Sequence, residues 1–227
     1  MPTQTEICIV RHGQSTANAD YTTYGSMEES KIPLSSQGRK EGVGAAQKVR
    51  EHMLWHGIDP EMAKIYSSPY VRALDTARMI RELALHRTTN ANKTIRTDHL
   101  LIEQCFGESQ SFPSFQEFLG TNPEEKRLFE TMGPAMYRCR RGDSITDVYT
   151  RVGLFVERRR WFAGDMPFCI IVAHNVACQC LQAYLTDPRD LPDYTTVWPT
   201  GGVRFFTVYP ELQKAEPSSA PGNKPTQ

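Results

Sequence analysis

Two histidines directly follow two apolar runs of the chain, and both are placed to do chemistry. His12 comes after the run 7–10 with Arg11 beside it, and His174 comes after the run 168–173. Apolar runs of this length are typical of buried strands, and open α/β proteins bind ligands beyond the carboxyl ends of their strands. We therefore expect both imidazoles to lie at one edge of a sheet.

Further polar and ionisable side chains are expected at the same edge. Asn18 follows the first run, and Glu103 follows a third short strand. Arg72 lies in the first turn of a helix that Ser68, as N-cap, and Pro69 are expected to open. Guanidinium groups offer planar forks of donors that suit phosphate oxygens, and a helix N-terminus adds partial positive charge. Such a set of groups is suited to transferring a phosphoryl group.

The elements that must position these groups alternate between strands and helices. We expect strands at 6–10, 63–66, 94–97, 168–173 and 203–208, and helices at 35–56, after 68, after 144 and after 174. Ser35 is the expected N-cap of the helix 35–56, and Ser144 with Asp147 has the capping-box pattern. The alternation predicts an α/β fold, a three-layer α/β/α sandwich whose mainly parallel sheet has one antiparallel edge strand, at 203–208.

A segment of looser pattern interrupts this alternation. Residues 107–141 carry several phenylalanines and a break at Asn122-Pro123, which predicts a small helical cap with its own core, inserted over the site. Residues 1–209 are therefore expected to form a single domain. Residues 210–227 are rich in Pro, Ser, Gly and Lys, which predicts a disordered tail.

Composition argues against several classes of partner. The 227 residues include 26 basic and 26 acidic side chains, so no basic excess favours nucleic acid or a membrane surface. No apolar stretch approaches the roughly 20 residues that span a bilayer, and the polar start of the chain is unlike a signal peptide. The six cysteines lack paired spacing, so we expect reduced thiols and a cytoplasmic protein.

Four motifs, in order along the chain, resemble the histidine phosphatase superfamily of phosphoglycerate mutases and acid phosphatases. They are Arg11-His12-Gly13-Gln14-Ser15 with Asn18, the stretch Ser67–Ala73 around Arg72, Glu103, and Ala173-His174. A finer resemblance, to a eukaryotic subgroup of small mutase-like phosphatases, rests on Tyr21-Thr22-Thr23, Glu103-Gln104-Cys105-Phe106-Gly107, the stretch Tyr137–Ser144, Asp147-Val148-Tyr149 and Arg151. The resemblance implies a mutase-like catalytic domain over most of the chain.

The resemblance also implies a role for each matching residue. His12 would be the nucleophile and become phosphohistidine, which agrees with the nucleophilicity of a neutral imidazole. Glu103 would protonate the leaving oxygen and then take a proton from water, with Glu108 as the alternative. His174 would be the third catalytic residue, which in its protonated form would surround the phosphoryl oxygens together with Arg11 and Arg72. The expected phosphate-binding residues are Arg11, Asn18, Arg72 and Asn175, and Asn175 stands where many relatives have glycine. Candidate specificity residues are Tyr21, Thr22 and Arg138.

The expected activity is that of a phosphomonoesterase of the acid phosphatase type, acting on a small phosphorylated molecule. No metal or other cofactor is expected, although a phosphate or sulfate ion would fit the site. Three alternatives stay open: a phosphoglycerate mutase, a phospho-ligand-binding protein with weak turnover, and a metallohydrolase that uses His12, His174 and Glu103 as ligands. The mutase is disfavoured because Tyr24-Gly25-Ser26 stands where mutases have Gly-Trp.

Two further expectations concern the surface of the molecule. The chain is expected to be a monomer or a homodimer, with neither nucleic acid nor a membrane as partner. The remaining histidines do not follow strands, so they are expected at the surface or its boundary; they are His52, His56, His86 and His99.

Overall fold

The computed structural model describes residues 5–85, 94–159, 168–193, 195–209 and 214–218. Its centre is a six-stranded sheet in the order β3-β2-β4-β1-β5-β6. The strands are β1 (Thr5–Arg11), β2 (Ala63–Ser67), β3 (Ile95–Thr97), β4 (Phe168–Ala173), β5 (Val203–Tyr209) and β6 (Lys214–Pro217). The first four are parallel, β5 runs antiparallel to β1, and β6 runs antiparallel to β5.

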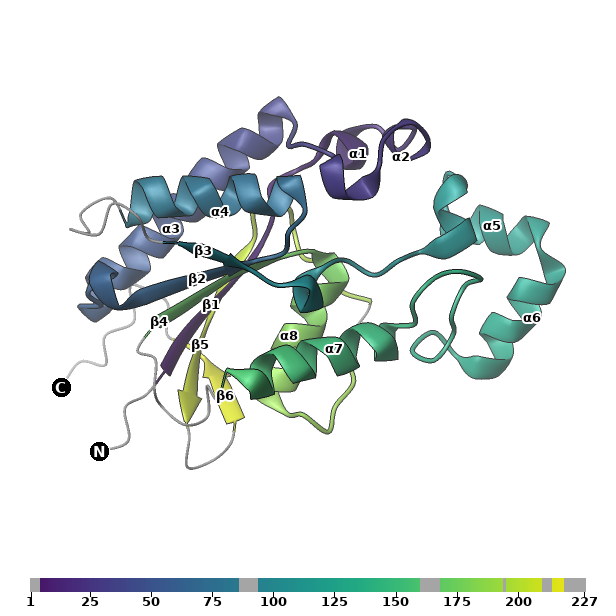
Figure 1. The fold of residues 1–227 in the computed structure, drawn as a ribbon. Helices are drawn as coiled ribbons and strands as arrows, with labels where there is room; N and C mark the ends of the chain where they lie inside the picture. The colour runs from purple at the N-terminus through teal and green to yellow at the C-terminus, as the bar shows by residue number, and fades with distance from the viewer. Residues whose placement is uncertain (1–4, 86–93, 160–167, 194, 210–213, 219–227) are drawn as a thin grey trace.

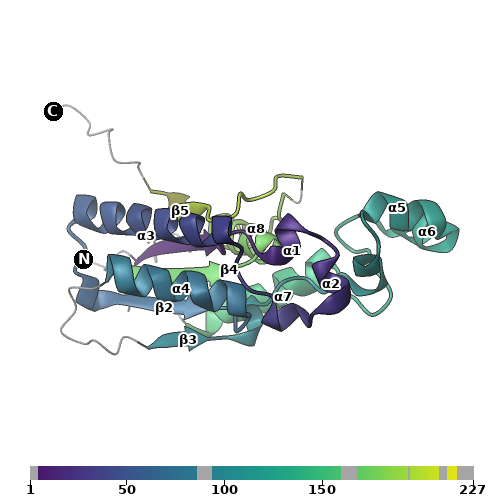
Figure 2. The same ribbon diagram turned by 90° about the horizontal axis from the view of Figure 1, so that it is seen from above.

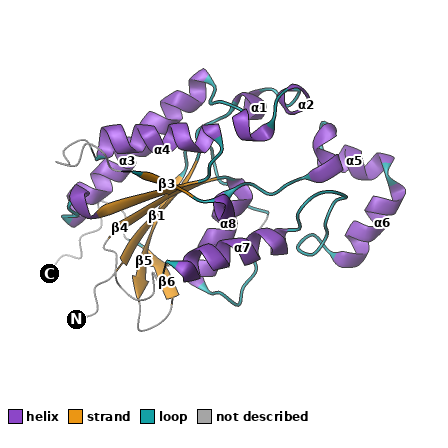
Figure 3. Ribbon diagram, viewed as in Figure 1, coloured by secondary structure: helices purple, strands orange, loops and turns teal. Residues whose placement is uncertain are grey.

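Helices cover both faces of this sheet. In Figures 1 and 3, α3 (Ser36–His56) and α4 (Val71–Ala84) lie on one face, and α7 (Ile145–Arg158) and α8 (Asn175–Thr186) lie on the other. Because side chains alternate along a strand, Ile7 and Ile9 of β1 pack with α7 and α8, whereas Cys8 and Val10 pack with α3 and α4. The predicted three-layer α/β/α class is confirmed.

Short helices complete the structure around the sheet. They are α1 (Thr16–Ala19), α2 (Thr23–Ser26), α5 (Phe115–Thr121), α6 (Pro123–Met132) and the 3₁₀ helices η1 (Glu29–Lys31), η2 (Pro60–Met62), η3 (His99–Leu101) and η4 (Gly107–Ser111). Figures 1 and 2 show α5 and α6 standing away from the sheet, beyond α7. A separate cluster of buried side chains there contains Phe118, Leu119, Tyr137 and Cys139, with Phe112, Phe115, Leu128 and Phe129 packed against it. These side chains thus pack together within the segment predicted to form the cap.

Capping follows the sequence at two helices and departs from it at a third. Ser35 caps α3, and Ser144 with Asp147 forms the expected capping box of α7. Ser68 was expected to cap α4, and this is wrong: Tyr70 is still extended, at φ −66° and ψ 138°, so the helix begins at Val71. The Ser68 hydroxyl is instead bound to His174.

The antiparallel side of the sheet extends further than the sequence indicates. Residues 203–208 do form a strand antiparallel to β1, but β6 pairs on its outer side, so β5 is not at the edge. The prediction of a disordered tail over 210–227 is wrong for 214–217, since these residues gain backbone pairing with β5. Residues 210–213 and 219–227 lie outside the described residues.

One histidine expected near the surface is buried. His52 is 1% exposed, because it lies on the core-facing side of α3 and stacks on Phe205 of β5, with ring centroids 3.7 Å apart. His56 and His99 are exposed as expected, and His86 lies outside the described residues. All six cysteines are free thiols, and five of them are buried. Within the described ranges, no helix is long and apolar enough to cross a bilayer.

Candidate active site

The ends of two parallel strands bring the two histidines together. Arg11, the last residue of β1, pairs with Ala173, the last residue of β4, so His12 and His174 leave the sheet side by side. The His12 N–H donates to the Ala173 carbonyl at 3.0 Å, and the two imidazole centroids lie 5.0 Å apart. The predicted convergence of the imidazoles at one sheet edge is confirmed.

The backbone fixes which nitrogen of His12 is free to react. Nδ1 lies 2.7 Å from the Gly13 carbonyl oxygen, which can only accept, so this hydrogen bond assigns the ring proton to Nδ1. Nε2 then carries the lone pair, and it accepts a 3.2 Å hydrogen bond from Nε of Arg72. Burial and the nearby Arg72 guanidinium lower the pKa of His12 well below its ordinary value. His12 is therefore a neutral imidazole whose reactive nitrogen faces Arg72.

Arg72 is held by a carboxylate that the sequence did not predict. Its side chain is almost fully buried, Nη1 donates to the Glu29 carbonyl at 2.7 Å, and Nη2 donates to Glu29 Oε1 at 3.0 Å. Glu29 belongs to η1, in a polar segment without hydrophobic periodicity, so no sequence signal marked it. A carboxylate and a phosphate would compete for the same fork of donors.

His174 is buried against Ser68 and Tyr70. Its Nε2 lies 2.8 Å from Ser68 Oγ, its Nδ1 is buried without a hydrogen-bond partner, and its ring meets that of Tyr70 edge-on at 5.1 Å. Burial and the nearby Arg72 lower the pKa of His174 well below its ordinary value. These influences favour a neutral His174 ring in this structure, whereas the expectation of a protonated His174 concerns the site with a phosphoryl group bound and stays a prediction.

Glu103 has the setting of a proton donor. It is 8% exposed, and its Oε1 accepts hydrogen bonds from the backbone N–H groups of Gln104, at 3.0 Å, and Val176, at 3.1 Å. Burial nevertheless raises the pKa of its carboxyl group. The alternative, Glu108, faces Arg140 at 3.7 Å with its side chain 41% exposed. Glu103 is thus the better candidate for acid–base chemistry.

Arg151 of α7 holds the segment that carries Glu103. Its guanidinium donates to the carbonyl oxygens of Leu100, at 2.8 Å, Ile102, at 2.7 Å, and Glu103, at 3.0 Å. Three backbone acceptors on one fork fix the position of the chain directly before the carboxyl group. Arg151 lies in one of the motifs that carry the family resemblance, and this contact with the Glu103 segment gives it a positioning role.

This arrangement coincides with a family match along nearly the whole chain. The model of the histidine phosphatase superfamily, branch 1, matches residues 7–211. The chain belongs to the histidine phosphatase superfamily. The phosphoglycerate mutase-like protein AT74H of Arabidopsis thaliana is 31% identical over 164 residues, which are 70% of this chain and 54% of that protein. The related protein AT74 of the same plant is 29% identical over 153 residues, 66% of this chain and 45% of its own length.

The fold of this chain is similar to that of solved phosphatase structures. This histidine phosphatase chain spans about half the length of the plant relatives it matches. The alpha-ribazole phosphatase from Shigella flexneri has a TM-score of 0.70 at 16% identity, over 94% of this chain and 95% of that one. A mycobacterial glucosyl-3-phosphoglycerate phosphatase in complex with VO3 has a TM-score of 0.66 at 20% identity, over 94% of this chain and 97% of that one. The shared feature is the fold.

The other expected phosphate-binding residues are Arg11, Asn18 and Asn175, and each forms hydrogen bonds with neighbouring groups of the protein. Arg11 Nη1 donates to the Trp198 carbonyl, and its Nε is buried without a partner. The Asn175 Oδ1 accepts from the Trp198 N–H at 2.9 Å. Asn18 is exposed, and its Oδ1 accepts from the N–H and hydroxyl of Ser15 at 3.0 Å each. The structure thus gives Asn18 and Asn175 structural hydrogen bonds.

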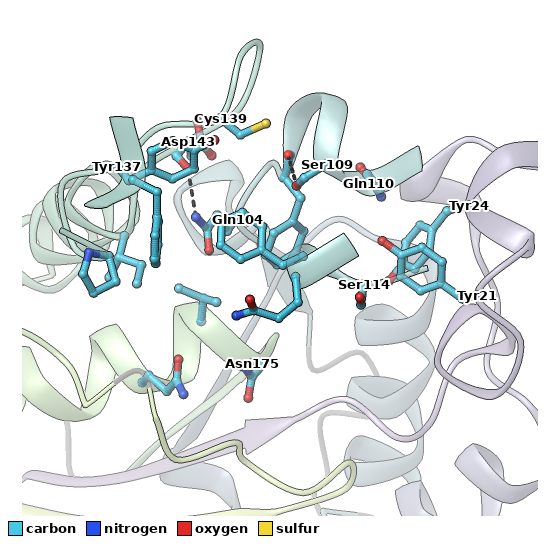
Figure 4. Close-up of a pocket in the computed structure, with 18 of the residues that line it drawn as sticks. Tyr21, Tyr24, Gln104, Ser109, Gln110, Ser114, Tyr137, Cys139, Asp143 and Asn175 are labelled. Atoms are coloured by element: carbon cyan, nitrogen blue, oxygen red, sulfur yellow. Dashed lines mark hydrogen bonds between the residues drawn. The ribbon is translucent and has the colours of Figure 1, made fainter. Parts of the chain in front are cut away.

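The candidate specificity residues divide between the cavity and the outer surface. Tyr21 lines a cavity of about 680 Å³ beside the site. Thr22 is exposed and donates to Asp20, and Arg138 pairs with Asp147 outside this cavity. Figure 4 shows this cavity, with Tyr21 and Tyr24 on one side and Tyr137 and Cys139 of the cap on the other. The site of this superfamily member is thus a buried cluster of charges next to a roomy cavity.

Proposed function

We propose that the protein is a phosphomonoesterase that acts through a phosphohistidine at Nε2 of His12. The observation that carries this proposal is the buried His12, whose unprotonated Nε2 accepts a 3.2 Å hydrogen bond from Nε of Arg72 and whose ring lies beside His174. A nucleophile with an adjacent guanidinium is what attack on a phosphate ester requires, because the attacked group is an anion.

In the first step, the lone pair of His12 Nε2 forms a bond to phosphorus while the P–O bond to the alcohol breaks. Glu103 gives its proton to the leaving oxygen, since its raised pKa favours the protonated form. Arg11 and Arg72 balance the charge on the remaining phosphoryl oxygens. The positive charge that develops on the ring is stabilised by the hydrogen bond from Nδ1 to the Gly13 carbonyl.

In the second step, the Glu103 carboxylate takes a proton from a water molecule, whose oxygen attacks phosphorus. The P–N bond breaks, phosphate leaves, and His12 and Glu103 return to their starting protonation states. This cycle consumes one water molecule and needs no metal, which we expect a strong chelator to show by leaving turnover intact.

Hydrolysis is favoured over mutase activity by the chemistry of the cavity. Among the described residues that line it, none is a lysine, arginine or histidine that could bind the carboxylate of a phosphoglycerate. Two of the similar structures also carry phosphatase names, the alpha-ribazole phosphatase and the glucosyl-3-phosphoglycerate phosphatase, whereas the plant relatives are named mutase-like.

The test is release of phosphate from para-nitrophenyl phosphate, with inactivation by a His12→Ala substitution. We expect kcat to fall by about 10³-fold or more, and the matched His56→Ala variant, at an exposed position of α3, to keep full activity. Wild-type enzyme quenched during turnover should carry acid-labile phosphate, and His12→Ala should carry none. Undiminished turnover by His12→Ala would contradict the proposal, and primer-dependent isomerisation of phosphoglycerates without phosphate release would favour the mutase.

A further inference from the structure

The cavity beside the catalytic cluster has six aromatic side chains among its described lining residues. Its volume of about 680 Å³ lies within the range of about 300–1,000 Å³ that is usual for small-molecule sites. Tyr21 and Tyr24 come from the segment before α3, and their rings pack against each other at 5.1 Å. The cap contributes further rings, which are Phe106, Phe115, Phe129 and Tyr137. A flat ring would therefore find aromatic partners on both sides.

The cavity adjoins the groups that handle the leaving oxygen. Gln104, Asn175 and Val176 line it, and each directly follows or binds a residue of the catalytic cluster. The Val176 N–H donates to the Glu103 carboxyl at 3.1 Å, so this carboxyl lies where the cavity wall meets the site. An alcohol that receives its proton from Glu103 would thus extend into the cavity.

The walls of the cavity carry little charge, and what they carry is negative. Among the described lining residues, Asp143 is the only one that is charged, and it lies 4.0 Å from Arg151 outside the cavity lining. Two of the cap arginines, Arg138 and Arg140, pair outside the cavity lining, with Asp147 and Glu108. Five side-chain amides provide uncharged hydrogen-bonding groups instead; they are Gln104, Gln110, Gln116, Asn175 and Gln179. A carboxylate would lose water here without gaining a cationic partner.

We infer that the substrates are phosphate monoesters of bulky, uncharged alcohols that carry an aromatic ring. Polar groups on such an alcohol bind the amides, the ring packs between the tyrosines and the cap, and small carboxylated phosphates are selected against. The inference rests on the proposed phosphomonoesterase activity, and it adds the class of leaving group to that activity.

The first test compares three primary alkyl phosphates whose leaving oxygens have similar basicity. They are 2-(naphthyl)ethyl phosphate, propyl phosphate and 3-phosphooxypropanoate. We expect kcat/KM to be about tenfold or more higher for the naphthyl compound than for propyl phosphate, because a buried ring is removed from water. We expect the carboxylated compound to have the lowest value of the three, and a preference for it would overturn the inference.

Two variants locate this selectivity in the cavity. Gln116 is exposed on α5 and lines the cavity, so Gln116→Lys should raise kcat/KM for 3-phosphooxypropanoate by about threefold to tenfold. Gln47→Lys adds the same charge at an exposed position of α3 and should change nothing. Phe106 is 38% exposed, so Phe106→Ala should spare the fold, and it should lower the ratio of kcat/KM for the naphthylethyl ester to that for the propyl ester about fivefold. Trp55→Ala removes an aromatic side chain of similar exposure outside the cavity lining and should leave this ratio unchanged.

The failure of this inference can be told apart from failure of the proposed function. If His12→Ala abolishes all hydrolysis but the carboxylated phosphate is preferred, the phosphatase stands and the substrate class is wrong. If no ester is hydrolysed, calorimetry with naphthylmethyl phosphonate and methyl phosphonate still reports on the cavity. Equal affinity for the two phosphonates would overturn the inference, and at least tenfold tighter binding of the naphthyl compound would support it.

Discussion

Burial of ionisable groups controls the chemistry of individual residues in this site. The pKa of His12 is lowered by burial and Arg72, and the pKa of Glu103 is raised by burial. Both shifts favour the protonation states that the reaction needs, a neutral nucleophile and a protonated acid. Glu29 adds to this balance, because its carboxylate holds Arg72 and its charge also raises the pKa of Glu103.

The pH dependence of turnover should report these two groups. The first step needs protonated Glu103, so kcat/KM should fall as the pH rises through the Glu103 pKa. It also needs neutral His12, so the acid limb should lie well below the ordinary histidine pKa of about 6.5. We predict that Glu103→Gln lowers kcat by about 10²–10⁴-fold and removes the alkaline limb. Steady-state kinetics across the pH range would show this, and an unchanged alkaline limb would assign it to another group.

At the level of elements, the ends of strands and the starts of helices meet to form the site. The segment after β1 passes close to the start of α3: a Cβ at Gly13 would lie 2.1 Å from the Gly38 carbonyl oxygen. The same Gly13 provides the carbonyl that orients the His12 ring. The packing of β1 against α3 therefore determines where Nε2 points.

A methyl group at Gly13 should disturb both packing and catalysis. We predict that Gly13→Ala lowers the free energy of unfolding by about 1–3 kcal/mol and lowers kcat by about tenfold to a hundredfold. Gly44→Ala is the matched control. Gly44 lies in α3, the helix that Gly13 approaches, and a Cβ added there meets no atom within 4 Å. That change should stabilise the protein by about 0.5–1 kcal/mol without affecting kcat. Urea unfolding would measure the free energy of unfolding of both variants, and steady-state kinetics would measure their kcat. A Gly13→Ala enzyme with wild-type stability and kcat would contradict the role given to the close packing at Gly13.

At the scale of the whole molecule, catalysis and one long-range anchor lie at opposite ends of the sheet. The catalytic side chains follow the carboxyl ends of β1 and β4, whereas Glu6 lies near the start of β1. There Glu6 accepts hydrogen bonds from Thr207 and, at 2.7 Å, from Ser218, which follows β6. The C-terminal segment thus closes the sheet far from the reacting groups.

Removal of this segment should affect stability but not chemistry. We predict that a chain ending at Tyr209 loses about 1.5–3 kcal/mol from the Ser218–Glu6 hydrogen bond alone, with further loss from the pairing of β6. A chain ending at Ser218 keeps both the Ser218–Glu6 hydrogen bond and the pairing of β6, so its free energy of unfolding should match that of the full-length protein. Urea denaturation would measure the difference, while kcat/KM at low temperature should agree for all three chains. A fall in kcat/KM without loss of folded protein would show coupling to the site.

Local sequence information was sufficient wherever a residue's role depends on its immediate neighbours. The capping box of α7 and the apolar strand before His174 were predicted because caps and strands are patterns of a few consecutive residues. Ser68 was misassigned because its hydroxyl bonds to His174, which is distant in the chain. His52 and β6 were misjudged for the same reason, since their partners lie in other elements.

The sequence by itself determined the order of strands and helices along the chain and the placement of Arg11, His12, Arg72, Glu103 and His174 beside their ends. Only the tertiary structure decided that burial lowers the pKa of His174, that Glu29 holds Arg72, and that the cavity lacks cationic side chains among its described lining residues. The physical reason is that pKa values and the charge of a cavity depend on burial and on distances between groups far apart in the chain. The positions of strand ends and helix caps, by contrast, depend mainly on residues that are neighbours in the sequence.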